Sequence, residues 1–251
     1  MAAFKRVAHR GASGAYPENT RVALIKAIES RADMIELDCQ MTKDGHVVVF
    51  HDETLERTAG VRGTVRASTL AQLKALDLGR WKGKAHAGER ILTLEEAIAI
   101  VRGAADLCLE IKSRRDLPSG IELKMLFTLS HFDYLDRAVF SSFDYWCLAR
   151  LREFAPEAKI AVLFGDHSEQ DPFDAVKNVG ASALHVQKDL ASRGILEQAW
   201  ELGIDVFVWT VNEATDIETF ASMGVQGLIS DFPDRLWNFH RRSAAERKFR
   251  R

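Results

Sequence analysis

The chain has 251 residues, of which 47% are hydrophobic and 28% are charged, and its formal net charge at pH 7 is −2. This length is sufficient to bury a large core, either in one domain or in two small ones. The near-neutral charge argues against a nucleic-acid-binding protein, which normally carries a strong basic excess. We therefore expect neither DNA nor RNA as a partner.

The first residues and the cysteines indicate the cellular compartment. Residues 1–6 lead directly into an apolar run without the apolar core and cleavage pattern of a signal peptide, and no apolar stretch approaches membrane-spanning length. Cys39, Cys108 and Cys147 are odd in number and far apart, which argues against a disulfide framework and against a thiolate metal site. We expect a cytoplasmic protein with no stable membrane association.

Short runs rich in β-branched residues recur along the chain and predict eight strands. These runs are residues 6–9, 34–40, 107–111, 138–141, 159–164, 183–186, 205–209 and 227–230. Segments with helical periodicity lie between them, such as residues 20–29, 94–101, 145–154, 195–202 and 214–222. This alternation implies parallel strands that are connected by helical crossovers.

Eight such units in a chain of this length predict an α/β fold of the (β/α)8 TIM-barrel type, in which catalytic groups gather at the carboxyl ends of the strands. A doubly wound open sheet is the alternative. The barrel is favoured because His9, Glu36, Glu110, Trp209 and Asp231 all fall at or just past strand ends, and one shared rim would collect them. We expect a single domain over residues 1–251.

The interval between the second and third predicted strands breaks the regular spacing. It contains a turn at residues 43–45, a short strand at 47–50 and a Gly- and Arg-rich stretch that follows. We interpret residues 52–90 as a small insertion over the barrel mouth, where Trp81 and several basic residues would help to shape the substrate entrance. A solvated excursion is the alternative. The basic tail at residues 241–251 is expected to be a frayed helix or a disordered end.

Three carboxylates on predicted strands are the most informative feature of the chain. Glu36 and Asp38 project from the same face of one strand because successive side chains alternate, and Glu110 lies on another strand. Charge is costly to bury unpaired, so this placement implies a cation, a basic partner or water beside them. Oxygen ligands without thiolates or a histidine cluster favour Mg²⁺ or Ca²⁺ over Zn²⁺.

Histidine and basic side chains accompany these carboxylates. His9 and His51 each end a predicted strand, and imidazole is the side chain best suited to exchange protons near neutral pH. Lys112 shares strand parity with Glu110, so a buried ion pair is one interpretation. The functional interpretation is that Lys112 and Arg10 hold an anionic group such as a phosphate, which the metal also touches.

Several neighbouring residues have two possible roles. Asn19 or Thr20 would cap the first helix, and Glu18, just before it, would face the site. Trp209 is either core packing or a platform for an apolar substrate face. His185, at the end of the sixth predicted strand, is either a pocket residue or structural. The remaining histidines are expected on turns or surfaces, without a role: His46, His86, His131, His167 and His240.

Taken in order, a set of short motifs resembles the glycerophosphodiester phosphodiesterase family over nearly the entire chain. The set comprises His9-Arg10-Gly11, Pro17-Glu18-Asn19-Thr20, Glu36-Leu37-Asp38, Thr42-Lys43-Asp44-Gly45, His51-Asp52, Glu110-Ile111-Lys112, Val208-Trp209-Thr210-Val211-Asn212 and Ser230-Asp231-Phe232-Pro233. Single motifs are weak signals, but the ordered set is highly specific. The chain looks like the short cytoplasmic bacterial form.

The resemblance implies a metal-dependent hydrolase that cleaves glycerophosphodiesters, such as glycerophosphocholine or glycerophosphoethanolamine, to sn-glycerol 3-phosphate and an alcohol. It implies that one divalent cation, Mg²⁺ or Ca²⁺, is held by Glu36, Asp38 and Glu110. His9 and His51 would form the acid/base pair. The substrate would be bound at the phosphate by Arg10 and Lys112 and along the cleft by Phe143 and Trp209.

Other functions remain open at this point. A lysophospholipase D or a phosphoinositide-cleaving phosphodiesterase is the nearest alternative, and a non-catalytic phosphate-binding barrel is a more distant one. The attacking group would be either water or the substrate's own glycerol hydroxyl, and His9 is favoured as the base with His51 as the acid. The preferred alcohol and the oligomeric state do not follow from the sequence.

Overall fold

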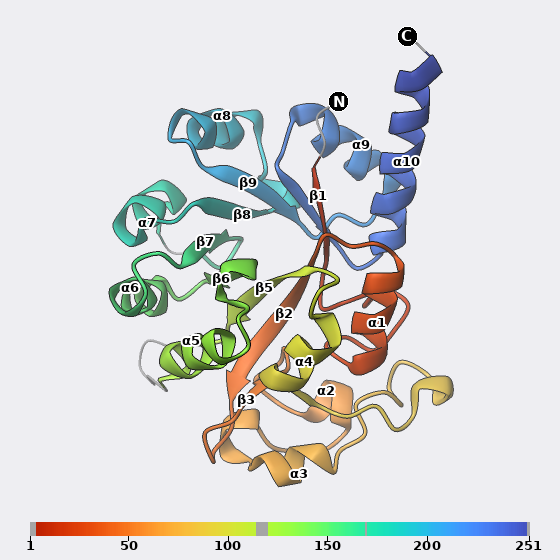
Figure 1. Ribbon diagram of the computed structural model, residues 1–251, viewed down its shortest axis with the longest axis vertical. Coiled ribbons are helices and arrows are strands. Elements are labelled where there is room, and N and C mark those ends of the chain that lie inside the picture. The colour runs from red at the N-terminus through yellow and green to blue at the C-terminus, as the bar shows by residue number, and fades with distance from the viewer. Residues whose placement is uncertain (1–3, 114–119, 169, 250–251) are drawn as a thin grey trace.

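The computed structural model of the protein describes residues 4–113, 120–168 and 170–249, with residues 242–249 described by their backbone alone (Figure 1). Over these residues the eight predicted strands are present and run parallel: β1 (Lys5–Ala8), β2 (Met34–Met41), β5 (Asp106–Ile111), β6 (Ala138–Ser142), β7 (Lys159–Phe164), β8 (Ala183–Gln187), β9 (Asp205–Trp209) and β10 (Gly227–Ser230). Strand β1 pairs with both β10 and β2, so the sheet closes on itself. The predicted (β/α)8 barrel is confirmed, and the doubly wound open sheet is excluded.

Helices surround the barrel and connect its strands (Figure 1). In chain order they are α1 (Arg21–Glu29), α4 (Leu94–Val101), α5 (Ile121–His131), α6 (Tyr145–Phe154), α7 (Pro172–Val179), α8 (Arg193–Glu201), α9 (Ala214–Met223) and α10 (Pro233–Phe249), with short 3-10 turns at Leu135–Arg137 and Lys188–Leu190. The basic tail, which we expected to be a frayed helix or a disordered end, is helical as far as Phe249, and residues 250–251 lie outside the described part. No helix of the described residues is long and apolar enough to cross a membrane.

Two apolar layers hold the barrel together. The larger one lies between the strands and the helices, where buried aliphatic side chains from both meet. The smaller one fills the barrel interior and consists of Val7, Met34, Cys108, Ala161, Ala183, Phe207 and Ile229. Gly227 makes room for this filling, because a Cβ at that position would lie 2.1 Å from the Phe207 ring.

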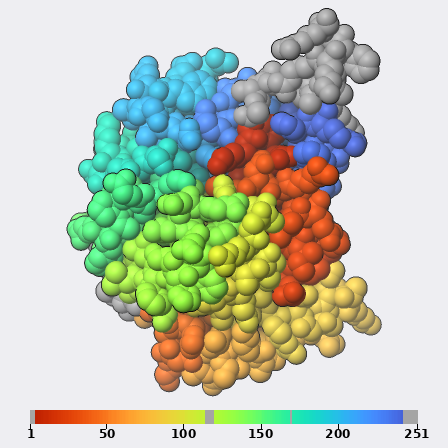
Figure 2. Space-filling model, in the orientation of Figure 1, coloured from red at the N-terminus to blue at the C-terminus, as the bar shows by residue number. Residues whose placement is uncertain are grey.

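Strand β2 extends beyond the barrel and supports the insertion. Its last residues pair antiparallel with β3 (Val47–Val49), which pairs in turn with β4 (Leu92–Thr93). Between β3 and β4 lie α2 (Glu56–Ala59), α3 (Leu70–Lys74) and two 3-10 turns at Val65–Ala67 and Lys84–His86. Figure 2 shows this segment, in orange to yellow, as a layer in continuous contact with the barrel.

The insertion has its own apolar core. Its buried members are Val48, Phe50, Leu55, Val65, Leu73, Leu78 and Ile91. Polar contacts join it to the loop after β1, because Lys82 Nζ donates to the Ser13 carbonyl at 2.7 Å and the Tyr16 and His86 rings meet edge to face at 5.5 Å. The segment is therefore a packed part of the molecule and not a solvated excursion.

The core of the insertion predicts a measurable contribution to stability. Leu73 is 1% exposed, so Leu73→Ala is expected to lower the free energy of unfolding by about 2 to 4 kcal/mol, through lost burial and the cavity that remains. Leu123→Ala removes the same atoms from a side chain that is 51% exposed and serves as the matched control. Denaturant unfolding followed by circular dichroism measures both, and equal losses would show that the insertion core does not stabilise the fold.

Candidate active site

A cavity of about 550 Å³ opens at the carboxyl ends of the barrel strands. Its lining includes all the predicted site residues except one: His9, Arg10, Glu36, His51, Glu110, Lys112, Phe143 and Trp209. The exception, Asp38, is fully buried behind this lining and contacts both Arg10 and Lys112. Residues that are distant in sequence thus meet at one rim, as expected for this fold.

The three predicted metal ligands lie together on two neighbouring strands. Glu36 and Asp38 are on β2, and in the parallel register of β2 with β5 Asp38 is the direct partner of Glu110. One carboxylate oxygen of each residue lies within 4.8 Å of one from each of the others. Glu36 and Asp38 are buried, so the oxygens converge in a place that water reaches poorly.

The close approach of the three buried carboxylates shifts their pKa values. Burial, followed by the charges of Asp38 and Glu110, raises the pKa of Glu36 well above its usual value. Burial also raises the pKa of Glu110 to about 7, against the opposing effect of Lys112. Although burial opposes it, the charges of Lys112 and Arg10 hold the pKa of Asp38 below its ordinary range.

The cluster fits a hard divalent cation. Glu36 Oε1 is buried and has no hydrogen-bond partner among the described residues, so one acceptor of the cluster lacks a donor. Three carboxylates supply only oxygen ligands, the kind that Mg²⁺ and Ca²⁺ prefer. A bound cation would also offset the mutual repulsion that raises the pKa of Glu36.

Two basic side chains flank the carboxylates. The Arg10 main-chain N–H donates to Glu36 Oε2 at 2.9 Å, and the Arg10 Nε lies 3.3 Å from Asp38 Oδ2. The φ angle of Arg10 is 54°, in the left-handed region, which costs energy for a residue other than glycine. Lys112 Nζ lies 3.0 Å from Asp38 Oδ1 and 2.5 Å from Glu110 Oε1. Both cations also line the cavity, where an anion of the substrate would meet them.

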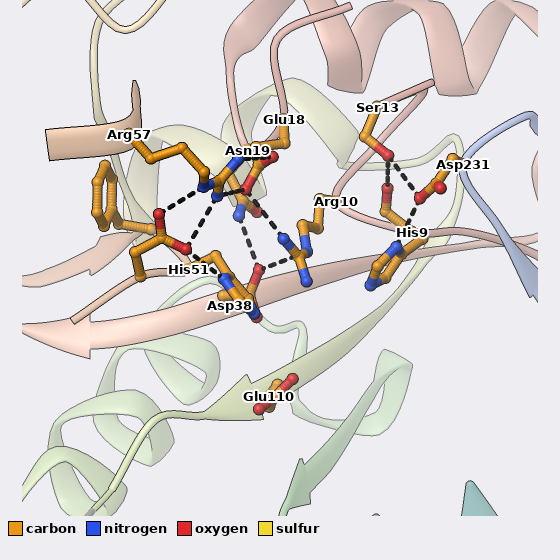
Figure 3. Close-up of polar contacts among 12 residues, drawn as sticks. His9, Arg10, Ser13, Glu18, Asn19, Asp38, His51, Arg57, Glu110 and Asp231 are labelled. Atoms are coloured by element: carbon orange, nitrogen blue, oxygen red, sulfur yellow. Dashed lines mark hydrogen bonds and ion pairs between the residues drawn. The ribbon is translucent and has the colours of Figure 1, made fainter. Parts of the chain in front are cut away.

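His9 is oriented by a carboxylate that the sequence analysis left without a role. Its Nδ1 lies 2.6 Å from Asp231 Oδ1, which also accepts a hydrogen bond from Ser13 Oγ at 2.9 Å (Figure 3). Asn212 Nδ2 donates to the other oxygen of Asp231 at 2.7 Å. A carboxylate can only accept, so the proton is on Nδ1, and Nε2, which lies 4.0 Å from Glu36 Oε2, is the nitrogen that remains for a substrate.

His51 has a matching arrangement. Its Nδ1 lies 2.7 Å from Asp52 Oδ1, so its Nε2 is again the nitrogen that remains for proton transfer. Burial, together with the nearby charges of Lys112 and Arg10, lowers the pKa of His51. The charge of Asp38 acts in the opposite direction and favours the imidazolium form.

The residues that precede α1 contribute to the site as well as to the start of the helix. Thr20 is at the N-cap position but makes no capping hydrogen bond; its Oγ1 donates to the Pro17 carbonyl at 2.6 Å. Asn19 Nδ2 donates to Asp38 Oδ2 at 2.8 Å, and Glu18 accepts from Arg10 Nη1 at 3.0 Å. Thr20, one of the two expected residues, is therefore the N-cap residue but lacks a side-chain capping bond, whereas the Asn19 side chain finds its partner in the site.

Aromatic side chains form part of the cavity wall. The rings of Phe143 and Trp209 meet edge to face at 5.9 Å, and Trp209 Nε1 donates to the His185 carbonyl at 3.0 Å. His185 lines the cavity and is 2% exposed, and burial lowers its pKa to about 3, so it is a neutral pocket residue. His167, which we expected on a surface without a role, also lines the cavity.

Sequence reasoning did not assign the supporting residues Asp52, Asp231, Asn212 and Arg57. The first three stand inside motifs that were quoted, next to or near residues of predicted function, but a motif does not say which histidine a carboxylate orients. Arg57 lies in the insertion and had no signal beyond its charge. Its guanidinium lies between Glu18 and Asp52 and bonds to both.

Comparison with known proteins supports the family resemblance that the sequence motifs indicate. The model of the glycerophosphoryl diester phosphodiesterase family matches residues 9–235. A glycerophosphodiester phosphodiesterase of Caldanaerobacter subterraneus subsp. tengcongensis is 38% identical over 238 residues, which cover 94% of this chain and 97% of the relative. A protein of the same name from Bacillus altitudinis is 36% identical over 237 residues, 92% and 96% of the two chains. A mouse lysophospholipase D is 26% identical over 272 residues, covering 94% of this chain and 82% of that protein.

Among solved structures, an Oleispira antarctica phosphodiesterase in complex with the product sn-glycerol-3-phosphate superimposes with a TM-score of 0.87. It is 28% identical, and the match covers 93% of this chain and 95% of the other. The family and the enzyme class predicted from the sequence are confirmed. By the extent of the family match and by its relatives, the chain belongs to the glycerophosphoryl diester phosphodiesterase family.

Proposed function

We propose that the chain hydrolyses glycerophosphodiesters, such as glycerophosphocholine or glycerophosphoethanolamine, to sn-glycerol 3-phosphate and an alcohol. The observation that carries this proposal is one cavity that combines three converging carboxylates, two histidine–aspartate pairs and two basic side chains. The relatives named for this activity and the structural neighbour in complex with sn-glycerol-3-phosphate support it.

Glu36, Asp38 and Glu110 are the proposed ligands of one divalent cation, Mg²⁺ or Ca²⁺. When bound, such an ion acts as a Lewis acid toward a phosphate oxygen. A phosphodiester anion repels nucleophiles and has a poor alkoxide leaving group, so its charge must be neutralised. Arg10 and Lys112 supply two further positive charges at the same wall and would orient the phosphate.

His9 and His51 are the proposed acid/base pair. Each carries its proton on Nδ1, held by an aspartate, and presents Nε2 for transfer. One imidazole would take the proton of the attacking water or glycerol hydroxyl on its free Nε2. The other, as an imidazolium with a second proton on Nε2, would give that proton to the leaving oxygen. We retain His9 as the base and His51 as the acid. Phe143 and Trp209 would contact the apolar parts of the substrate.

A lysophospholipase D activity is the second candidate, because the mouse relative carries that name. The cavity wall also contains Asp166, Lys188 and Asp189, and these charged groups suit a small polar alcohol better than an acyl chain. The near-neutral charge supports a small-molecule substrate without a nucleic-acid partner. The three free, buried thiols support the proposed cytoplasmic location.

Removal of divalent cations tests the carboxylate cluster. Treatment with a chelator is expected to abolish hydrolysis of glycerophosphocholine, and addition of Mg²⁺ or Ca²⁺ is expected to restore it. Glu36→Gln keeps the shape but removes one charge, so calorimetric titration should show weaker cation binding than for the wild type. Full activity in the presence of chelator would remove Glu36, Asp38 and Glu110 from this role.

Each histidine is tested by truncation. His9→Ala and His51→Ala are each expected to lower kcat by roughly 10²- to 10⁴-fold, the usual contribution of a positioned acid or base. His46→Ala, at an exposed position, is the control and should retain the wild-type rate. Circular dichroism establishes that the variants are folded. A wild-type rate in folded His9→Ala or His51→Ala would defeat the assignment of that residue.

The substrate class is tested by comparing glycerophosphocholine with a lysophospholipid of the same headgroup. The charged cavity wall predicts a higher kcat/KM for glycerophosphocholine in an assay of phosphomonoester release. A higher value for the lysophospholipid would favour the second candidate. If neither diester is cleaved in the presence of Mg²⁺ or Ca²⁺, while inorganic phosphate still binds, the chain is a non-catalytic phosphate-binding barrel.

A further inference from the structure

We propose that Arg57 is a positioning residue through which the insertion fixes two parts of the active site, His51 and Arg10. The inference rests on the proposed function, because it concerns how the same reaction is supported. Arg57 lies on α2, outside the barrel, and does not line the cavity. Its effect would therefore pass through the two carboxylates that it contacts, Glu18 and Asp52.

The guanidinium makes four hydrogen bonds. Nε and Nη2 donate to the two oxygens of Asp52 at 2.6 Å and 2.9 Å. Nη1 and Nη2 donate to the two oxygens of Glu18 at 2.8 Å and 2.6 Å (Figure 3). Two edges of one planar group thus hold two carboxylates, each by both oxygens, which is the geometry that arginine provides and lysine does not.

The contact with Asp52 reaches His51. Asp52 Oδ1 accepts both from Arg57 Nη2 and from His51 Nδ1, the latter at 2.7 Å. With both oxygens held by Arg57, the plane of the Asp52 carboxylate is fixed. This fixes the direction from which the imidazole proton is accepted, and with it the tautomer and the orientation of the ring.

The contact with Glu18 reaches Arg10. Glu18 Oε1 accepts from Arg57 Nη2 at 2.6 Å and from Arg10 Nη1 at 3.0 Å. Arg10 is one of the proposed phosphate ligands, and its Nε lies 3.3 Å from Asp38 Oδ2. Arg57 Nη2 therefore touches two oxygens, one of which contacts a proton-transfer group and the other a phosphate-binding group.

The insertion holds Arg57 in this position. The guanidinium carbon lies 5.3 Å from the centre of the Trp81 ring, and Trp81 Nε1 donates to the carbonyl of Leu78, a member of the insertion core. The other histidine does not depend on this segment. Asp231, the partner of His9, is held by Ser13 and Asn212, which lie on the loops after β1 and β9.

A positioning role and a structural role can be separated here. The Arg57 side chain is 43% exposed, but those of Glu18 and Asp52 are only 12% and 21% exposed, so its loss is expected to lower the melting temperature. A purely structural role would stop there, whereas a positioning role also changes the orientation of His51 in protein that remains folded. Trp81, which stacks on Arg57, should act in the same direction when replaced by leucine.

Steady-state kinetics on the full chain with Mg²⁺ and glycerophosphocholine test the proposal. Arg57→Ala is expected to lower kcat by roughly 10- to 100-fold, the usual effect of losing a residue that orients a catalytic group. Arg57→Lys keeps the positive charge but cannot bond to both oxygens of both carboxylates, so it should recover only part of the rate. Arg66→Ala, an exposed arginine of the same insertion, is the matched control and should retain the wild-type kcat.

A double-mutant cycle shows whether the effect of Arg57 on kcat is transmitted through Asp52. If Arg57 acts through Asp52, the loss of kcat in Arg57→Ala combined with Asp52→Asn will be smaller than the product of the two single losses. Nitrogen NMR of ¹⁵N-histidine-labelled protein gives a readout that does not depend on turnover, with His51 identified by its absence in His51→Ala. The Nδ1–H tautomer should dominate in the wild type and in Arg66→Ala, and should be depleted in Arg57→Ala.

Failure of the positioning role of Arg57 and failure of the proposed hydrolase function give different experimental results. A kcat of Arg57→Ala equal to that of Arg66→Ala, or losses that multiply in the cycle, or an unchanged His51 tautomer, would each overturn the positioning role while the hydrolase assignment stands. A wild type that cleaves no glycerophosphodiester would overturn the proposed function, and the histidine resonances would then still decide whether Arg57 orients His51.

Discussion

The site depends on one electrostatic constraint, the convergence of three carboxylates in a poorly solvated corner between β2 and β5. Such a cluster is unfavourable by itself, and the raised pKa values of Glu36 and Glu110 express that cost. Arg10 and Lys112 offset part of the charge from two sides. A divalent cation among the carboxylates would offset the rest, and the same positive groups then face a substrate phosphate.

Around this centre the two imidazoles are supported in different ways. His9 depends on Asp231, which neutral donors from two barrel loops hold in place. His51 depends on Asp52, which a single arginine of the insertion holds together with Glu18. The barrel thus carries the proposed metal ligands and the support of one imidazole, and in our proposal the insertion supports the other. Variation in the insertion would be expected to affect the chemistry of one proton transfer and not of both.

The barrel was predictable from the sequence because eight β-branched runs with helices between them leave few alternatives. Glu36, Asp38, Glu110 and Lys112 were predictable as neighbours, since strand parity and shared strand ends place them on one face. The roles of Asn19 and Arg57 were not, because a pattern along the chain carries no information about which distant carboxylate an amide or a guanidinium will meet. Asn19 looked like a helix cap by local rules, and the long-range bond to Asp38 prevailed.

The central claim is that Glu36, Asp38 and Glu110 bind one divalent ion beside both imidazoles. The most direct measurement is an anomalous difference map from crystals grown with Ca²⁺ or with Mn²⁺ as a substitute for Mg²⁺. The account predicts one strong peak within about 2.0 to 2.6 Å of an oxygen from each of the three carboxylates, inside the cavity that His9 and His51 line. A map at saturating metal with no peak there, or with a peak that these carboxylates do not touch, would contradict it.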